Sequence, residues 1–181
     1  MTELTSKQKK ERLEMLKSIT LKDVVFGRGH DCGGLIADIY FKRKMVATYH
    51  DDGWGGEPEV TFLTKDIEET IRKYIADSKV EEHMLKTDWD NPIWTKDGKG
   101  LGFFTVLESA VEFISSHMEH MKRVRKLQTN KLVLEKDGEL YTKGFGMSMA
   151  KIKKNPRLLL QLKDIIKKEK SQGYELLNTN I

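Results

Sequence analysis

The sequence has little cysteine and no long hydrophobic run. Cys32 is the single cysteine among 181 residues, which excludes an intramolecular disulfide and favours a reducing compartment. The apolar stretches are far shorter than the roughly 20 residues that a membrane-spanning helix needs, so we expect no membrane segment. Residues 1–17 are polar and lack the apolar stretch of a signal peptide. We therefore expect a cytoplasmic protein that does not contact membranes.

The sequence also lacks the short motifs of common catalytic and metal sites. Neither HExxH nor a pair of CxxC motifs is present. The spacing typical of metal-dependent nucleases, two acidic strand residues followed by x-Lys, is missing as well. From these absences we assign no catalytic residue, no metal ligand and no cofactor.

What the sequence does have is an uneven division of charge. Residues 1–121 contain 17 Lys and Arg against 22 Asp and Glu, while residues 122–181 contain 15 against 6. The first part carries −5 and the last third +9, in agreement with the formal net charge of +4. Clustered cations gain affinity for phosphate by releasing counterions. The division therefore indicates a polyanion-facing surface in the last third of the chain.

Hydrophobic periodicity predicts an α+β fold, with small antiparallel sheets built from hairpins and packed by one long and two or three shorter amphipathic helices. Alternation over residues 35–50, around a turn at Lys42 to Lys44, predicts a hairpin followed by a strand at residues 59–63. Apolar residues recur every three or four positions from Phe103 to Leu127, which predicts the long helix. Thr105 and Glu108 match a capping box at its start.

Other elements follow from turn and capping signals. Thr64 is placed to cap a helix through residue 78, and a short helix is predicted over residues 6–18. Asp137-Gly138 is typical of a type I′ hairpin turn, and Asn155-Pro156 precedes a predicted helix from Arg157 to Lys170. Residues 87–102 lack a period and are predicted to form a loop. We expect one compact domain, 1–181, divisible into an acidic hairpin-helix half (1–100) and a basic helix-hairpin-helix half (101–181).

The first candidate site is the basic end of the chain. Cations near a helix C-terminus complement the helix dipole, which accounts for residues 122–126 and 167–170. The excess at residues 151–157 falls at a predicted helix start, where positive charge is unfavourable, and this favours a binding role. Phe145, in the neighbouring glycine-rich run, offers a ring for stacking. The candidate nucleic-acid-binding residues are Lys151, Lys153, Lys154, Arg157, Arg123, Arg125 and Phe145.

The second candidate site is an acidic, glycine-rich loop. Its glycines permit close backbone approach, its carboxylates can hold a cation, and functional residues concentrate on loops. The alternative is a tight connection between strands with its tryptophan packed onto the core. The loop consists of Asp51, Asp52, Gly53, Trp54, Gly55 and Gly56. The segment Lys44 to Gly56 resembles stretches of small uncharacterised phage and mobile-element proteins, which implies an origin and no mechanism.

Three further sets of residues keep other functions open. The i, i+3 spacing of His117 and His120 suits a zinc site completed by His30 or Cys32. Tryptophan is enriched at protein interfaces, and the chain has Trp54, Trp89 and Trp94. Carboxylates that can arrange around magnesium near Lys65 are Asp38, Asp51, Asp52, Glu57 and Glu59.

Together these patterns predict a non-enzymatic binding protein that contacts nucleic acid or nucleotide phosphates through its basic C-terminal third. The first alternative is a protein–protein interaction or inhibitor module that uses exposed tryptophans and the acidic N-terminal part. The second is a magnesium-dependent phosphodiesterase or nuclease.

Overall fold

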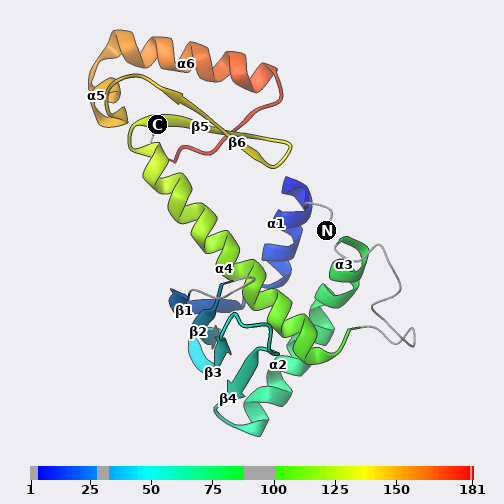
Figure 1. Ribbon diagram of the computed structural model, residues 1–181. Helices are drawn as coiled ribbons and strands as arrows, with labels where there is room; N and C mark the ends of the chain where they lie inside the picture. The colour runs from blue at the N-terminus through cyan, green and yellow to red at the C-terminus, as the bar shows by residue number, and fades with distance from the viewer. Residues whose placement is uncertain (1–3, 28–32, 88–100, 180) are drawn as a thin grey trace. The chain divides into compact units, whose positions relative to one another are not determined.

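A computed structural model describes residues 4–27, 33–87, 101–179 and 181. The protein is α+β, with helices and two antiparallel sheets, as predicted (Figure 1). The chain divides into two compact units, residues 1–116 and residues 117–181, which are called unit 1 and unit 2 below. The boundary falls within the long helix, so each unit contains part of that helix.

Unit 1 is a four-stranded antiparallel sheet in the order β1-β2-β3-β4, together with helices. Each strand pairs with the next along the chain, so the sheet is a simple meander. Its elements are α1 (Ser6–Met15), β1 (Ile19–Phe26), β2 (Leu35–Phe41), β3 (Lys44–Asp51), β4 (Glu59–Phe62), α2 (Lys65–Ser78), α3 (Val80–Thr87) and the first part of α4 (Phe103–Gln128).

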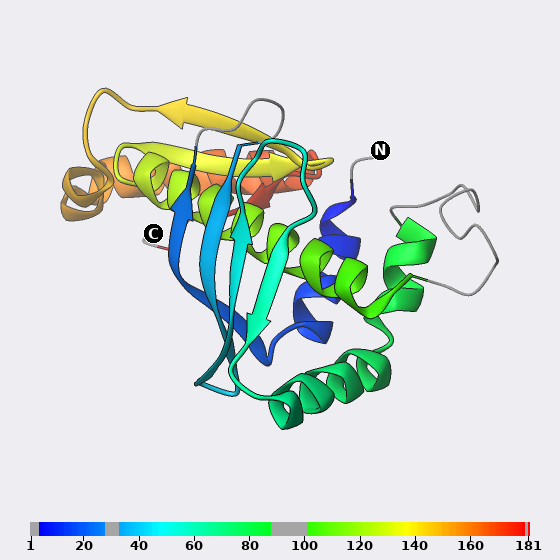
Figure 2. The same cartoon turned by 60° about the horizontal axis from the view of Figure 1, so that its bottom comes forward.

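The core of unit 1 lies between this sheet and α4, which crosses one face of the sheet (Figure 2). Side chains alternate between the two faces of a strand. In β2 and β3 the residues that face α4 include Ala37, Ile39 and Tyr49, each exposed by 1% or less. They pack in one cluster with Val106 and Leu107 of α4. The first part of the long helix therefore uses an apolar face, while Met118 further along the predicted face is 40% exposed.

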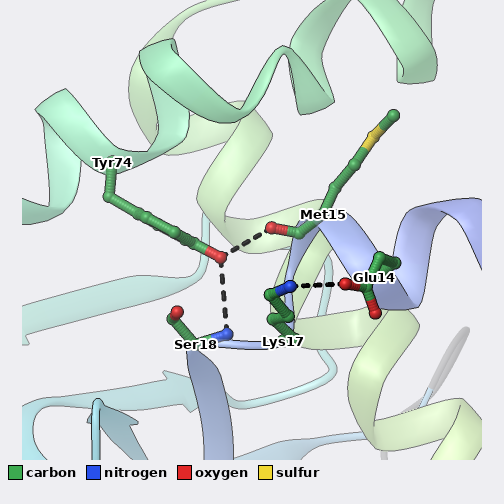
Figure 3. Close-up of polar contacts among 5 residues, drawn as sticks. All are labelled: Glu14, Met15, Lys17, Ser18 and Tyr74. Atoms are coloured by element: carbon green, nitrogen blue, oxygen red, sulfur yellow. Dashed lines mark hydrogen bonds and ion pairs between the residues drawn. The ribbon is translucent and has the colours of Figure 1, made fainter.

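Tyr74 of α2 fastens the segment between α1 and β1 (Figure 3). Its hydroxyl donates to the carbonyl of Met15 at 2.6 Å and accepts from the backbone N–H of Ser18 at 3.4 Å. The Tyr74 ring also meets the Phe41 ring edge-on, with centroids 4.9 Å apart. On the exposed side of the same turn Lys17 pairs with Glu14. The start of the sheet is thus held by α2 as well as by its neighbouring strand.

Unit 2 is a three-stranded antiparallel sheet in the order β6-β5-β7, packed by helices. Its core joins Leu132 and Leu134 of the central strand to Met149, Ile152 and Leu162 of two helices. Asp137 and Gly138 have φ of 53° and 86°, which confirms the predicted type I′ turn. Its elements are the remainder of α4, β5 (Lys131–Lys136), β6 (Glu139–Gly144), α5 (Met149–Lys154), α6 (Pro156–Ser171) and β7 (Glu175–Leu176).

The helices differ from the predictions in several places, among them α1, which ends at Met15 rather than at residue 18, and α3, which was not predicted. The capping box at Thr105 and Glu108 is wrong: α4 begins at Phe103, and the backbone N–H of Val106 donates to the Gly102 carbonyl at 3.1 Å. The residues before the predicted Arg157 helix form a separate short helix, α5, which the sequence did not predict. The predicted loop at 87–102 lies almost wholly outside the described residues.

Candidate functional site

The predicted phosphate-binding residues all lie in unit 2. Helix α5 carries Lys151, Lys153 and Lys154, and Arg157 lies in the first turn of α6. All four side chains are exposed, as are Arg123 and Arg125 near the end of α4. Asn155 separates the two helices and its side-chain oxygen accepts from the backbone N–H groups of Arg157 and Leu158, at 3.1 and 3.3 Å. This cap fixes where α6 starts and therefore where Arg157 lies.

A backbone hydrogen bond joins the end of α4 to the start of α5. The N–H of Met149 donates to the carbonyl of Thr129 at 3.0 Å. Ser148 caps α5 by accepting from the backbone N–H of Lys151 at 3.4 Å. Arg125 is about 6 Å along the helix axis from Thr129. The hydrogen bond at Thr129 therefore places the last turn of α4 next to α5. We call these two parts of unit 2 the basic end.

The segments that contain the basic end and the residues around it have no acidic residues. Residues 120–134 and 140–163 contain no Asp or Glu and eleven Lys and Arg. Unit 2 as a whole contains 15 Lys and Arg against 7 Asp and Glu, which gives +8, while unit 1 contains 17 against 21, which gives −4. The boundary between positive and negative charge along the chain thus lies close to the boundary between the two compact units.

The predicted helix position of these lysines is right only in part. We expected Lys151, Lys153 and Lys154 near a helix start, where positive charge is unfavourable. All three lie in the last turn of α5, where cations complement the helix dipole. Lys151 is also the third residue of this six-residue helix, with its backbone N–H capped by Ser148, and Arg157 lies in the first turn of α6. The dipole therefore accounts locally for the three lysines, and the case for binding rests on the charge of the whole basic end.

Phe145 forms part of a pocket wall and is half-buried. It packs against the core of unit 2 together with Leu158 and Ile165. The pocket lies beside α5 and the start of α6, so Phe145 belongs to the same end of unit 2 as the cations. The pocket has a volume of about 120 Å³ and is lined by Phe145, Met147, Ile152, Leu158, Gln161, Leu162 and Ile165.

The acidic loop of unit 1 holds its own conformation. The backbone N–H of Gly53 donates to the Asp51 carboxylate and that of Trp54 to the Asp52 carboxylate, both at 2.8 Å. In such turns the carboxylates accept hydrogen bonds from the backbone of the same loop. The expectation that Trp54 packs onto the core is wrong, since its side chain is 66% exposed. Its exposure keeps Trp54 as a candidate contact for a protein partner.

Two carboxylates of α4 lie near this acidic loop, which the sequence did not indicate. Glu108 and Glu112, one turn apart on α4, lie near Asp51 and the buried Tyr49. Desolvation raises the pKa of Glu108, and the charges of Glu112, Glu57 and Asp51 raise it further. Desolvation followed by the charge of Asp51 raises the pKa of Glu112. In the sequence these two residues are visible only as an acidic pair at i, i+4 on a predicted helix. Their position near Asp51 follows from the fold.

Tyr49 is the buried member of this group. Burial is the main cause that raises the pKa of its hydroxyl, and the carboxylate of Glu112 adds to it. The side chain is fully buried, and among the described residues its hydroxyl has no hydrogen-bond partner. The group is therefore an electrostatically unfavourable cluster in the folded protein.

The predicted magnesium set is not assembled, and the predicted zinc set lies partly outside the described residues. In the strand register, Asp38 lies opposite Lys22 and Thr48, and Glu59 lies opposite His50. Asp38 and Glu59 are therefore on the sheet face opposite to Tyr49. Asp51 pairs with the buried Leu35 and so lies on the other face. His30 and Cys32 lie outside the described residues, as do Trp89 and Trp94. Within the described ranges no group of three His, Cys, Asp or Glu side chains is arranged to hold a metal ion.

Comparison of the chain with protein-family models, with curated proteins and with solved structures gives no match. The resemblance of residues 44–56 to phage and mobile-element proteins therefore stays a prediction. In the part of the chain that the structure describes, no helix is both long enough and apolar enough to cross a membrane.

Proposed function

We propose that this protein is a non-enzymatic nucleic-acid-binding protein that contacts phosphates through the basic end of unit 2. The observation that carries the proposal is the set of exposed cations at that end and at the start of α6, in segments without Asp or Glu: Arg123, Arg125, Lys151, Lys153, Lys154 and Arg157. Exposed lysines release condensed counterions when they bind phosphates, and this release favours binding without any reading of sequence.

The proposal places the phosphate contacts at α5 rather than over all of unit 2. The lysines of the last turn of α6 serve as a comparison, because α6 is a regular helix of 16 residues. Lys168 is about 16 Å along the axis from Arg157, at 1.5 Å per residue. The two helix ends therefore offer similar charge at separate places.

The test compares two triple variants of the full chain. In one, Lys151, Lys153 and Lys154 are replaced by Gln; in the other, Lys167, Lys168 and Lys170 are replaced by Gln. Both variants lose three positive charges, and all six lysines lie in or next to the last turn of a helix. Fluorescence anisotropy of a labelled single-stranded oligonucleotide, titrated at several salt concentrations, gives the affinity and its salt dependence.

We expect the α5 variant to flatten the plot of log affinity against log salt by about 2 units, at about 0.7 per lost phosphate contact. The α6 variant should change it much less. Equal loss in the two variants would show that only net charge matters and would contradict a site at α5. Wild-type affinity in the α5 variant would contradict the proposal outright.

A further inference from the structure

The apolar pocket of unit 2 is formed in part by α5 and α6, the helices that carry Lys151, Lys153 and Arg157. Lys151 and Lys153 flank the pocket residue Ile152 in the chain, and Arg157 precedes the pocket residue Leu158. Neighbouring Cα atoms are about 3.8 Å apart. The cations do not line the pocket, so their long side chains would meet the parts of a ligand that extend beyond it.

The walls of the pocket are apolar with one polar group. Ile152 and Leu162 form part of it and are only 2% and 1% exposed, so they belong to the fixed core. Met147 is 38% exposed, and methionine adapts its shape to what it contacts. Phe145 supplies an aromatic ring, and Gln161 supplies an amide that can both donate and accept hydrogen bonds.

We propose that this pocket receives one unpaired base of single-stranded nucleic acid, while Lys151, Lys153 and Arg157 hold the phosphates on either side of it. This proposal rests on the proposed function. The base stacks on Phe145, and the Gln161 amide meets its polar edge. Aromatic platforms bordered by cations are how proteins bind single strands with little sequence preference. In a duplex the bases are stacked and paired, so the pocket favours single strands over duplexes.

A ligand that uses both the cations and the apolar walls of the pocket differs from a simple polyanion. A polyanion uses the cations and leaves the apolar walls in water. A nucleotide with an exposed base satisfies both, because its base has an apolar face, a polar edge and a phosphate on each side. An acidic peptide with a leucine anchor would also carry both parts, and the experiment separates it from a base.

The experiment uses two labelled strands of equal length, one of thymidine nucleotides and one of abasic tetrahydrofuran units with the same phosphates. Both are titrated by anisotropy with the full chain and with two variants. Phe145→Leu keeps apolar bulk in the pocket and removes the aromatic ring. Lys151→Gln combined with Lys153→Gln removes charge and keeps the pocket. Urea denaturation of each variant verifies that it remains folded.

For the wild type we expect the thymidine strand to bind about fivefold or more tightly than the abasic strand, as stacking of one base predicts. Phe145→Leu should bring this ratio towards one while leaving the salt dependence unchanged. The lysine variant should weaken both strands and keep the ratio. A duplex that contains the thymidine strand should bind more weakly than the strand alone, despite its greater charge.

Equal affinity of the wild type for both strands would overturn the base pocket and leave the proposed function standing. No binding of either strand at low salt would overturn both. If the strands bind equally and a leucine-containing acidic peptide displaces them, while the same peptide with serine for leucine does not, the pocket belongs to a protein partner and our assignment is wrong.

Discussion

The backbone N–H of Met149 donates a hydrogen bond to the carbonyl of Thr129 at 3.0 Å, which ties the first residue of α5 to the residue after α4. Met149 is also 1% exposed and belongs to the core of unit 2. The short helix is therefore fixed at both its backbone and its apolar side. Its three lysines are exposed on a rigid support beside the cations of α4, which is what the proposed phosphate contacts require.

Replacing Asn155 by Ala should destabilise the protein by about 1 kcal/mol, because the side chain caps α6 through two backbone N–H groups. The free energy of unfolding from urea denaturation measures this. Asn130→Ala, at an exposed turn position, is the control and should have little effect. An Asn155→Ala variant as stable as the wild type would show that water replaces the cap at no cost.

Tyr49→Phe should leave the stability unchanged or raise it by up to about 1 kcal/mol, since the hydroxyl is buried without a partner among the described residues. Tyr74→Phe makes the same chemical change where the hydroxyl has two hydrogen bonds, and should cost about 1 kcal/mol. Urea denaturation of both variants compares the signs. Destabilisation of Tyr49→Phe as large as that of Tyr74→Phe would show that the Tyr49 hydroxyl is bonded in solution.

The carboxyls of Glu108 and Glu112 should make the protein less stable as the pH rises. Folding raises the pKa of both groups above the ordinary value of 4.5. The folded state therefore binds more protons than the unfolded state in the window above pH 4.5, so the free energy of unfolding falls as the pH increases through it.

The double variant Glu108→Gln with Glu112→Gln removes these two titrations. We expect it to be more stable than the wild type at pH 7 and to lose that advantage below about pH 4, where the carboxyls of the wild type are protonated in both states. Urea midpoints from pH 4 to pH 7 test this. A constant difference between variant and wild type over the whole range would contradict the raised pKa values.

Lys143 of β6 pairs with Glu169 of α6, whose side chain is only 7% exposed. Lys143→Met leaves this buried carboxylate without its cation and should destabilise the protein by about 1 to 3 kcal/mol. The double variant Lys143→Met with Glu169→Met should recover part of the loss, because it removes both charges. Chemical denaturation of the two variants is the measurement, and equal stability of both would contradict the expected recovery.

The elements that the sequence predicts well are those with a strong local signal. Strands β2 and β3 alternate clearly, and Asp137-Gly138 is a hairpin turn by its chemistry. Strand β1 was not predicted because a register irregularity between Lys22 and Val25, with Asp23 at a φ of 49°, breaks its alternation. Helix α5 has six residues, and its two buried apolar side chains are too few to display a helical period.

The candidate sites could be predicted only where one segment carries the signal. The basic end is visible in the sequence because its cations are close together along the chain. The pocket was not, because its walls come from residues 145–147, α5 and α6 and exist only once these pack together. Glu108 and Glu112 likewise reach Asp51 only through the packing of α4 on the sheet. Tertiary contacts, rather than local propensity, create both features.

The most direct test of the account is the salt dependence of oligonucleotide binding by the unmodified full chain. The account predicts binding at low salt and a steep linear fall of log affinity with log salt, because cations of the basic end displace counterions from phosphates. Absence of binding at low salt, or an affinity that does not change with salt, would contradict the claim that the basic end is a phosphate-binding surface.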